Sequence, residues 1–213
     1  MPVRKVSNRG RRNTIGSFPS IKMKRMIAYE SLIERDYIYV LDFEQDVLEY
    51  EEQPLSIEYR YEDKQRHYTP DFSVKKVNQR IIVECKPKVF VDTAENQRKF
   101  DVARSWCEES GYQFQVVVES ELREGLRLEN IKMLTRFARQ VVEPRIRAGL
   151  YSTLYSTEGE LTINDLAVQL SPINPSAAIP SILHMAFHHE IVVPLNNSKL
   201  SGSTPVSILP LQA

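Results

Sequence analysis

The chain of 213 residues has little cysteine, no long hydrophobic run and no repeated segment. No apolar stretch approaches the roughly 18–20 residues of a membrane-spanning helix, so the sequence predicts no transmembrane segment. The basic residues near the N-terminus are not followed by an apolar segment, and we therefore expect no secretory signal. Cys85 and Cys107 are the only cysteines. Two cysteines do not make a disulfide framework, and they favour a reducing cytoplasm.

A large excess of either charge is also absent. The 28 Lys and Arg residues balance 28 Asp and Glu residues, which argues against a protein that coats nucleic acid without specificity. The charges are unevenly placed, however, because residues 1–27 contain no acidic residue while acidic residues gather in 42–52. A solubilising tail is one interpretation of the basic arm. The other is DNA binding, for which the candidates are Arg9, Arg11, Arg12, Lys22, Lys24 and Arg25.

The hydrophobic pattern predicts an α/β fold. Residues 28–39 have apolar positions at helical spacing, whereas residues 55–61 alternate in the manner of a strand. Short apolar segments then follow polar turns, and together they predict an antiparallel meander. A helix over 94–110 ends before Gly111, and the next strand is expected to run parallel to an earlier one because a helix separates them. These segments predict helices flanking a mixed sheet.

A change in composition at Pro144 predicts a domain boundary. We expect a basic arm over 1–27, a first domain over 28–143 and a second over 144–213. In the second domain, helices are expected over 145–155, 162–167 and 177–188, with Thr162 as the N-cap of the middle one. Segments 191–193 and 206–208 are expected to pair. Three helices followed by a hairpin outline a small winged-helix-like domain.

Asp71 and Glu84 are the carboxylates that this pattern brings together. Asp71 starts one predicted strand, and Glu84 lies thirteen residues later near the end of its antiparallel neighbour. The turn lies at the far end, so the two carboxylates meet at one sheet edge. Residues two apart on a strand share a face, so Lys86 points the same way as Glu84 while Cys85 points to the other layer.

Two carboxylates and a lysine suit the hydrolysis of phosphodiesters. Carboxylate oxygens are the ligands that Mg²⁺ prefers, and Mn²⁺ is expected to substitute. The metal activates a water molecule and neutralises charge on the phosphate, and a lysine stabilises the charge that develops. A surface ion pair is the alternative for Glu84 and Lys86. The apolar run before Glu84 favours the catalytic interpretation, because it places the pair at the end of a central strand.

The residues resemble those of a known family. Pro70-Asp71 with Glu84-Cys85-Lys86 fits the motif of PD-(D/E)xK nucleases, whose core is the restriction-endonuclease-like mixed sheet flanked by helices. A narrower resemblance, over residues 25–120, is to the N-terminal nuclease domain of TnsA, the endonuclease subunit of heteromeric transposases. The segments that carry it are Ser31-Leu32-Ile33-Glu34, Glu52-Gln53-Pro54, Tyr68-Thr69-Pro70-Asp71-Phe72 and Val83-Glu84-Cys85-Lys86-Pro87.

The resemblance implies roles for four residues. Asp71, Glu84 and Glu34 would be metal ligands, and Lys86 would be the catalytic lysine. Glu30, one helical turn before Glu34, is the rival for the helix-borne carboxylate. The resemblance also implies cleavage of 5′ strands at transposon ends, in partnership with a DDE transposase subunit and an ATPase regulator. Such a protein would act on double-stranded DNA in the bacterial cytoplasm, associated with the nucleoid during transposition, and not at a membrane.

Two other functions remain open on the sequence. A stand-alone restriction or repair nuclease would share the same core. A DNA-binding regulator would use the nuclease fold as a scaffold. The presence of Glu34, Asp71, Glu84 and Lys86 together speaks against the regulator, because a degenerate nuclease need not keep all four.

Overall fold

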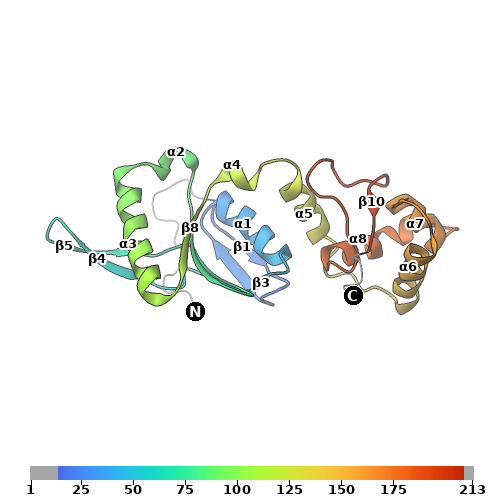
Figure 1. Cartoon of the computed structure of the whole chain (residues 1–213), viewed down its shortest axis with the longest axis horizontal. Helices are drawn as coiled ribbons and strands as arrows, with labels where there is room; N and C mark the ends of the chain where they lie inside the picture. Colours follow the sequence, from blue (N-terminus) through green and yellow to red (C-terminus); the bar gives the residue numbers. More distant parts are fainter. Residues whose placement is uncertain (1–13, 209–213) are drawn as a thin grey trace. The chain divides into compact units, whose positions relative to one another are not determined.

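The structure is a computed structural model, and it describes residues 14–208. The chain divides into two compact units, the first ending at Arg123 and the second beginning at Glu124 (Figure 1). No helix within residues 14–208 is long and apolar enough to cross a membrane. Each unit has its own buried core.

A four-stranded mixed sheet forms the centre of the first unit. Its order is β3 (Val47–Glu52), β6 (Phe72–Lys76), β7 (Arg80–Cys85) and β8 (Gln113–Val117). β3, β6 and β7 are antiparallel, whereas β7 and β8 run parallel. Helix α3 (Ala94–Ser110) makes the crossover between β7 and β8 and ends at Gly111, whose φ of 72° only glycine adopts without strain. The predicted α/β fold with a mixed sheet flanked by helices is confirmed.

Helix α1 (Leu32–Phe43) covers one face of this sheet. Its buried side chains, among them Tyr37 and Ile38, share a core with Phe72, Val74 and Val83 of the two central strands. The period-2 alternation of strands places these apolar residues on one face. The opposite face carries Ile82 and Glu84, and α3 approaches from that side through Ala103.

The sequence did not predict β3 as a strand, and a bulge explains why. The register between β3 and β6 shifts between Val47 and Glu49, so Val47 and Tyr50 are both buried although they lie three residues apart. An extra residue in one strand breaks the alternation on which strand prediction depends. The sheet therefore begins eight residues earlier in the chain than the predicted meander at residue 55.

The first strand of that predicted meander lies outside the main sheet. β4 (Ile57–Tyr61) and β5 (Lys64–Tyr68) pair with each other as a separate two-stranded ribbon, which projects beside α3 in Figure 1. Ile57 and Tyr68 at its base pack against Ala103 of α3. The alternating pattern of β4 reflects its packing against α3. The pattern does not indicate which strand pairs with β4.

The predicted helix over 28–39 begins later than expected. α1 starts at Leu32 after Ser31, whose side chain accepts a hydrogen bond from the Glu34 N–H as an N-cap. Upstream, β1 (Gly16–Pro19) and β2 (Met26–Tyr29) form a hairpin whose paired residues Phe18 and Ile27 are buried in the core with α1. The part of the predicted basic arm that the structure describes, residues 14–27, therefore belongs to the folded first unit.

The second unit is mainly helical. Its helices are α5 (Arg127–Thr135), α6 (Pro144–Ser156), α7 (Ile163–Leu170), the 3₁₀ turn η1 (Pro175–Ala177) and α8 (Ile179–Phe187). The short strand β9 (Leu161–Thr162) pairs antiparallel with β10 (Pro205–Val206), and Val192 bridges to Ser207. Thr162 is the N-cap of α7, as predicted, and it forms a capping box with Asp165.

The boundary between the units falls earlier than the predicted boundary between 143 and 144. Helix α5 packs against α8, so it is part of the second unit. The buried Asn130 of α5 strengthens this link, because its side chain bonds the backbone of the loop at Leu195, Ser198 and Leu200. The composition change at Pro144 marks the start of α6 and not the start of this unit.

Candidate active site

Asp71 and Glu84 lie at one edge of the central sheet. Phe72 of β6 pairs with Val83 of β7. Asp71 precedes Phe72 and Glu84 follows Val83, so the two carboxylates are neighbours across the hairpin. The backbone N–H of Cys85 donates a hydrogen bond of 2.7 Å to Oδ2 of Asp71. The structure therefore brings the two carboxylates together as the hairpin geometry predicts.

Glu84 is buried, and both of its carboxylate oxygens accept hydrogen bonds. The Tyr68 hydroxyl donates to Oε2 at 2.7 Å, and Nζ of Lys86 lies 2.6 Å from Oε1. Cys85 points to the opposite face and joins the core under α1. The prediction that Glu84 and Lys86 share a face is confirmed by this contact.

Glu34 stands on the first turn of α1. One of its carboxylate oxygens accepts a hydrogen bond of 2.7 Å from the N–H of Glu30, the residue before the N-cap Ser31. Glu30 itself accepts a hydrogen bond from the side-chain amide of Gln53 at 3.2 Å. The backbone N–H of Gln53 donates to the carbonyl of Asp71 at 2.8 Å. Residues from three separate segments thus converge on the same place.

The carboxylates of this cluster act on one another electrostatically. Burial raises the pKa of Asp71 well above its ordinary value, and the charges of Glu84 and Glu34 raise it further. Burial also raises the pKa of Glu34, with contributions from the charges of Glu30 and Glu84. A concentration of perturbed carboxyl groups is typical of a functional site.

Lys86 is the one cation in direct contact with these carboxylates among the described residues. Burial alone would lower the pKa of Lys86, but the charge and hydrogen bond of Glu84 and the charge of Asp71 outweigh it and raise the pKa. The ammonium group is therefore charged at neutral pH. By contrast, burial raises the pKa of the Cys85 thiol, which disfavours a nucleophilic thiolate.

The predicted metal ligands Asp71, Glu84 and Glu34 lie close together but do not form a ligand set as placed. Within residues 14–208, no three His, Cys, Asp or Glu side chains have the arrangement of a metal site. Oxygens of all three carboxylates are instead held by N–H, hydroxyl and ammonium groups of the protein. The donor chemistry nonetheless fits a hard divalent cation, because oxygen ligands and buried negative charges that repel one another both favour it.

The six basic residues predicted to bind DNA are placed differently from one another. Lys24 is exposed, with a φ of 53° in the β1–β2 turn. Nζ of Lys22 instead donates to backbone carbonyls at the end of α1 and the start of β3, and Arg25 forms a bidentate pair with the buried Glu52. Lys22 and Arg25 therefore stabilise the fold of the first unit through these contacts. The remaining three lie outside the described residues: Arg9, Arg11 and Arg12.

Two residues of this cluster were not assigned to the site on the sequence. In the sequence Tyr68 is only part of a segment that carries the family resemblance, because its hydroxyl contact with Glu84 depends on how the ribbon packs against the sheet. Gln53 served only as part of the family resemblance. Hydrophobic periodicity does not reveal a positive φ at a single polar residue. Gln53, with a φ of 45° directly before Pro54, is such a residue.

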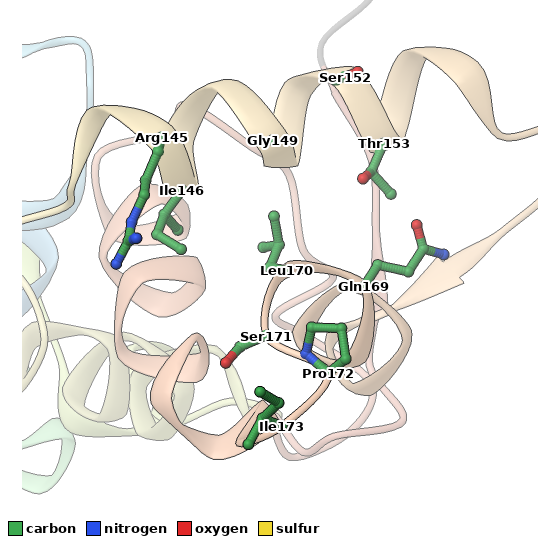
Figure 2. Close-up of a pocket in the computed structure, with 10 residues that line it drawn as sticks. All are labelled: Arg145, Ile146, Gly149, Ser152, Thr153, Gln169, Leu170, Ser171, Pro172 and Ile173. Atoms are coloured by element: carbon green, nitrogen blue, oxygen red, sulfur yellow. The ribbon is translucent and has the colours of Figure 1, made fainter.

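The second unit has a surface hollow of different chemistry. It encloses about 540 Å³ between α6, α7 and the loop that follows α7. Figure 2 shows Ile146 and Leu170 inside it, with Pro172 and Ile173 below and Arg145 at one end. No acidic side chain or histidine lines this hollow. The carboxylate chemistry described above therefore belongs to the first unit.

The first unit is an α/β domain whose mixed sheet, with two carboxylates and a lysine at one edge, is consistent with a nuclease-like fold. Residues 44–119 match the family model of the TnsA-like endonuclease N-terminal domain. This segment of the first unit is therefore related to TnsA-type endonucleases. The matched segment contains Asp71, Glu84 and Lys86, whereas Glu34 precedes it. No curated protein matches the chain.

Proposed function

We propose that the protein is a Mg²⁺-dependent DNA endonuclease that cuts the 5′ strands at transposon ends as a subunit of a heteromeric transposase. The observation that carries this proposal is the meeting of Asp71, Glu84 and Lys86 at one sheet edge, inside the segment that matches the TnsA-like family. The match supports an endonuclease. The sheet edge supplies the groups that phosphodiester hydrolysis needs.

Each residue has a role in this proposal. Asp71 and Glu84, with Glu34, would hold Mg²⁺, which when bound lowers the pKa of a water ligand and offsets charge on the scissile phosphate. Lys86 supplies a permanent positive charge close to Glu84, where it stabilises negative charge that develops on the phosphate oxygens. Tyr68 holds the second oxygen of Glu84 and so fixes the direction of that carboxylate.

The second unit is proposed to bind DNA or a partner subunit as a winged-helix-like module. Its support is the order of its elements, in which helix α6 is followed by β9, α7 and α8, and β9 pairs with β10 beside the Val192–Ser207 bridge. The proposed partners are a DDE transposase subunit and an ATPase regulator. Dependence on such partners would restrain cutting elsewhere in the genome.

Cleavage of a transposon end by wild type and Asp71→Ala tests the proposal. Both proteins are assayed in Mg²⁺ or Mn²⁺, with and without the neighbouring transposition proteins. We expect the 5′-strand cut only with the partners and only in wild type, with a loss of at least about a hundredfold in Asp71→Ala because a metal ligand is removed.

Other outcomes assign other functions. Strong cutting of plain duplex DNA by the purified chain indicates a stand-alone restriction or repair nuclease. If wild type and Asp71→Ala are equally inactive yet both bind DNA and support transposition, the nuclease proposal fails and the fold serves as a scaffold.

A further inference from the structure

Gln53 has an unusual backbone conformation. Its φ is 45°, in the left-handed region that residues with a Cβ adopt only at an energetic cost. Glycine or asparagine would adopt this conformation more easily. Strained residues of this kind persist where the side chain or the turn serves a function. The presence of glutamine here points to a use for its side chain.

Two hydrogen bonds join Gln53 to the candidate active site. Its backbone N–H donates to the Asp71 carbonyl at 2.8 Å, and its Nε2 donates to Oε1 of Glu30 at 3.2 Å. The Glu30 N–H in turn holds the carboxylate of Glu34. Gln53 therefore links the segment that carries Asp71 to the start of the helix that carries Glu34.

The other end of the Gln53 amide lacks a partner. Its Oε1 is buried and accepts no hydrogen bond from any residue between 14 and 208. Turning the amide over would set Oε1 against the Glu30 carboxylate oxygen that lies 3.2 Å from Nε2, and two acceptor oxygens do not bond each other. A buried acceptor without a donor is unfavourable, so a donor from a bound ligand is the expected complement.

The surrounding side chains do not supply that donor. Gln53 Oε1 has no hydrogen-bond partner among the described residues, and the Lys86 ammonium contacts Glu84 instead. A hydrated divalent cation does supply donors, since Mg²⁺ keeps several water ligands when carboxylates bind it. Groups that hold the water or the ligands of a metal contribute to metal affinity.

We propose that Gln53 is a positioning residue for the cation, holding Glu30 through its Nε2 and accepting a hydrogen bond from a cation-bound water through its Oε1. This inference rests on the proposed function, because it requires a divalent cation at Asp71 and Glu84. The backbone N–H of Gln53 keeps Asp71 in place whatever the side chain. The side chain and the backbone therefore have separate tasks.

Mn²⁺ binding to the full chain without DNA tests this proposal, with free Mn²⁺ followed by electron paramagnetic resonance. Gln53→Met keeps the length of the side chain without its polar atoms. Gln53→Gly keeps the backbone N–H and relieves the positive φ. We expect both variants to bind Mn²⁺ about tenfold more weakly than wild type. The melting temperature of Gln53→Gly in EDTA is expected to equal or exceed that of wild type.

Two further variants make the outcomes distinct. Gln65→Met is the matched control, because the Gln65 amide donates to Glu58 on the exposed ribbon, and it is expected to bind Mn²⁺ as wild type does. If wild type binds no Mn²⁺, or Asp71→Ala binds it equally well, the proposed cation site itself is refuted. If only Asp71→Ala loses Mn²⁺ while both Gln53 variants keep wild-type affinity, the role of Gln53 alone is overturned.

Discussion

At the scale of single residues, Glu84 shows how the site accommodates a carboxyl group in a buried place. The carboxylate is enclosed at the end of a central strand, and water is replaced by the Tyr68 hydroxyl and the Lys86 ammonium. Both donors come from groups near Glu84 in space, but only Lys86 is near it in sequence. Burial of a carboxylate is tolerated when each oxygen keeps a donor.

Tyr68→Phe is expected to destabilise the protein by about 1–3 kcal/mol, because a buried carboxylate oxygen loses its donor. The free energy of unfolding is measured by urea denaturation in EDTA. Tyr59→Phe on the same ribbon is the control, because Tyr59 is only half-buried, and we expect a change within about 0.5 kcal/mol. Equal stability of Tyr68→Phe and wild type would show that the hydroxyl contributes nothing to holding Glu84.

At the scale of elements, the β1–β2 hairpin is fastened to the first unit by buried polar groups. The Ser20 and Tyr50 hydroxyls both donate to the buried carboxylate of Asp42, which also accepts the backbone N–H of Ile21. Lys22 bonds the Glu44 carbonyl at the end of α1 and the Val47 carbonyl at the start of β3. These contacts explain why a segment without acidic residues is nonetheless folded, since its cations and N–H groups meet acidic partners from later in the chain.

The Arg25–Glu52 pair gives this fastening a pH dependence. Burial alone would raise the pKa of Glu52, but hydrogen bonds from Arg25 and from the Ala28 N–H lower it below the ordinary value of 4.5. A carboxyl group with a lowered pKa in the folded state stabilises the protein above its ordinary pKa. That stabilisation is lost as the pH falls through the pKa of the folded state.

Glu52→Gln is therefore expected to lower the free energy of unfolding by about 1 kcal/mol at pH 7, a value reduced for the partial exposure of Arg25. At pH 3 the difference between this variant and wild type is expected to shrink. Urea denaturation at both pH values measures it, with the exposed Glu49→Gln as the control. An undiminished difference at pH 3 would contradict the lowered pKa.

At the scale of the whole molecule, the two units carry different tasks. The first unit contains the carboxylate cluster, and the second has its own core and a loop held by Asn130. Because each unit buries its own residues, damage to one core is expected to leave the chemistry of the other in place.

Asn130→Ala tests this division. The substitution removes the buried Asn130 amide and its three hydrogen bonds to the loop backbone, and it is expected to destabilise the second unit by about 1–3 kcal/mol. Hydrogen exchange measured along the chain is expected to rise in residues 124–208, together with weaker binding to transposon-end DNA. Mn²⁺ affinity is expected to stay unchanged. The exposed Asn197→Ala is the control, and a parallel loss of Mn²⁺ binding in Asn130→Ala would show that the units are not independent.

The sequence by itself determined the features that depend on local spacing. Asp71, Glu84 and Lys86 meet because a hairpin with period-2 strands brings its open ends together whatever surrounds it. Helix α3, its Gly111 cap and the parallel β8 also follow from local signals and chain connectivity. The roles of these residues in catalysis remain predictions.

Only the tertiary structure decided how distant segments combine. The bulge in β3 concealed a strand, and the alternation of β4 did not reveal that its partner is β5 alone. Partners such as Glu52 for Arg25, or Tyr68 for Glu84, lie 16 to 27 residues away along the chain. Local hydrophobic periodicity indicates which side chains are buried, because the buried side chains of a helix or strand lie on one of its faces. It does not record which neighbour buries them, because that choice depends on the free energy of the whole packed unit.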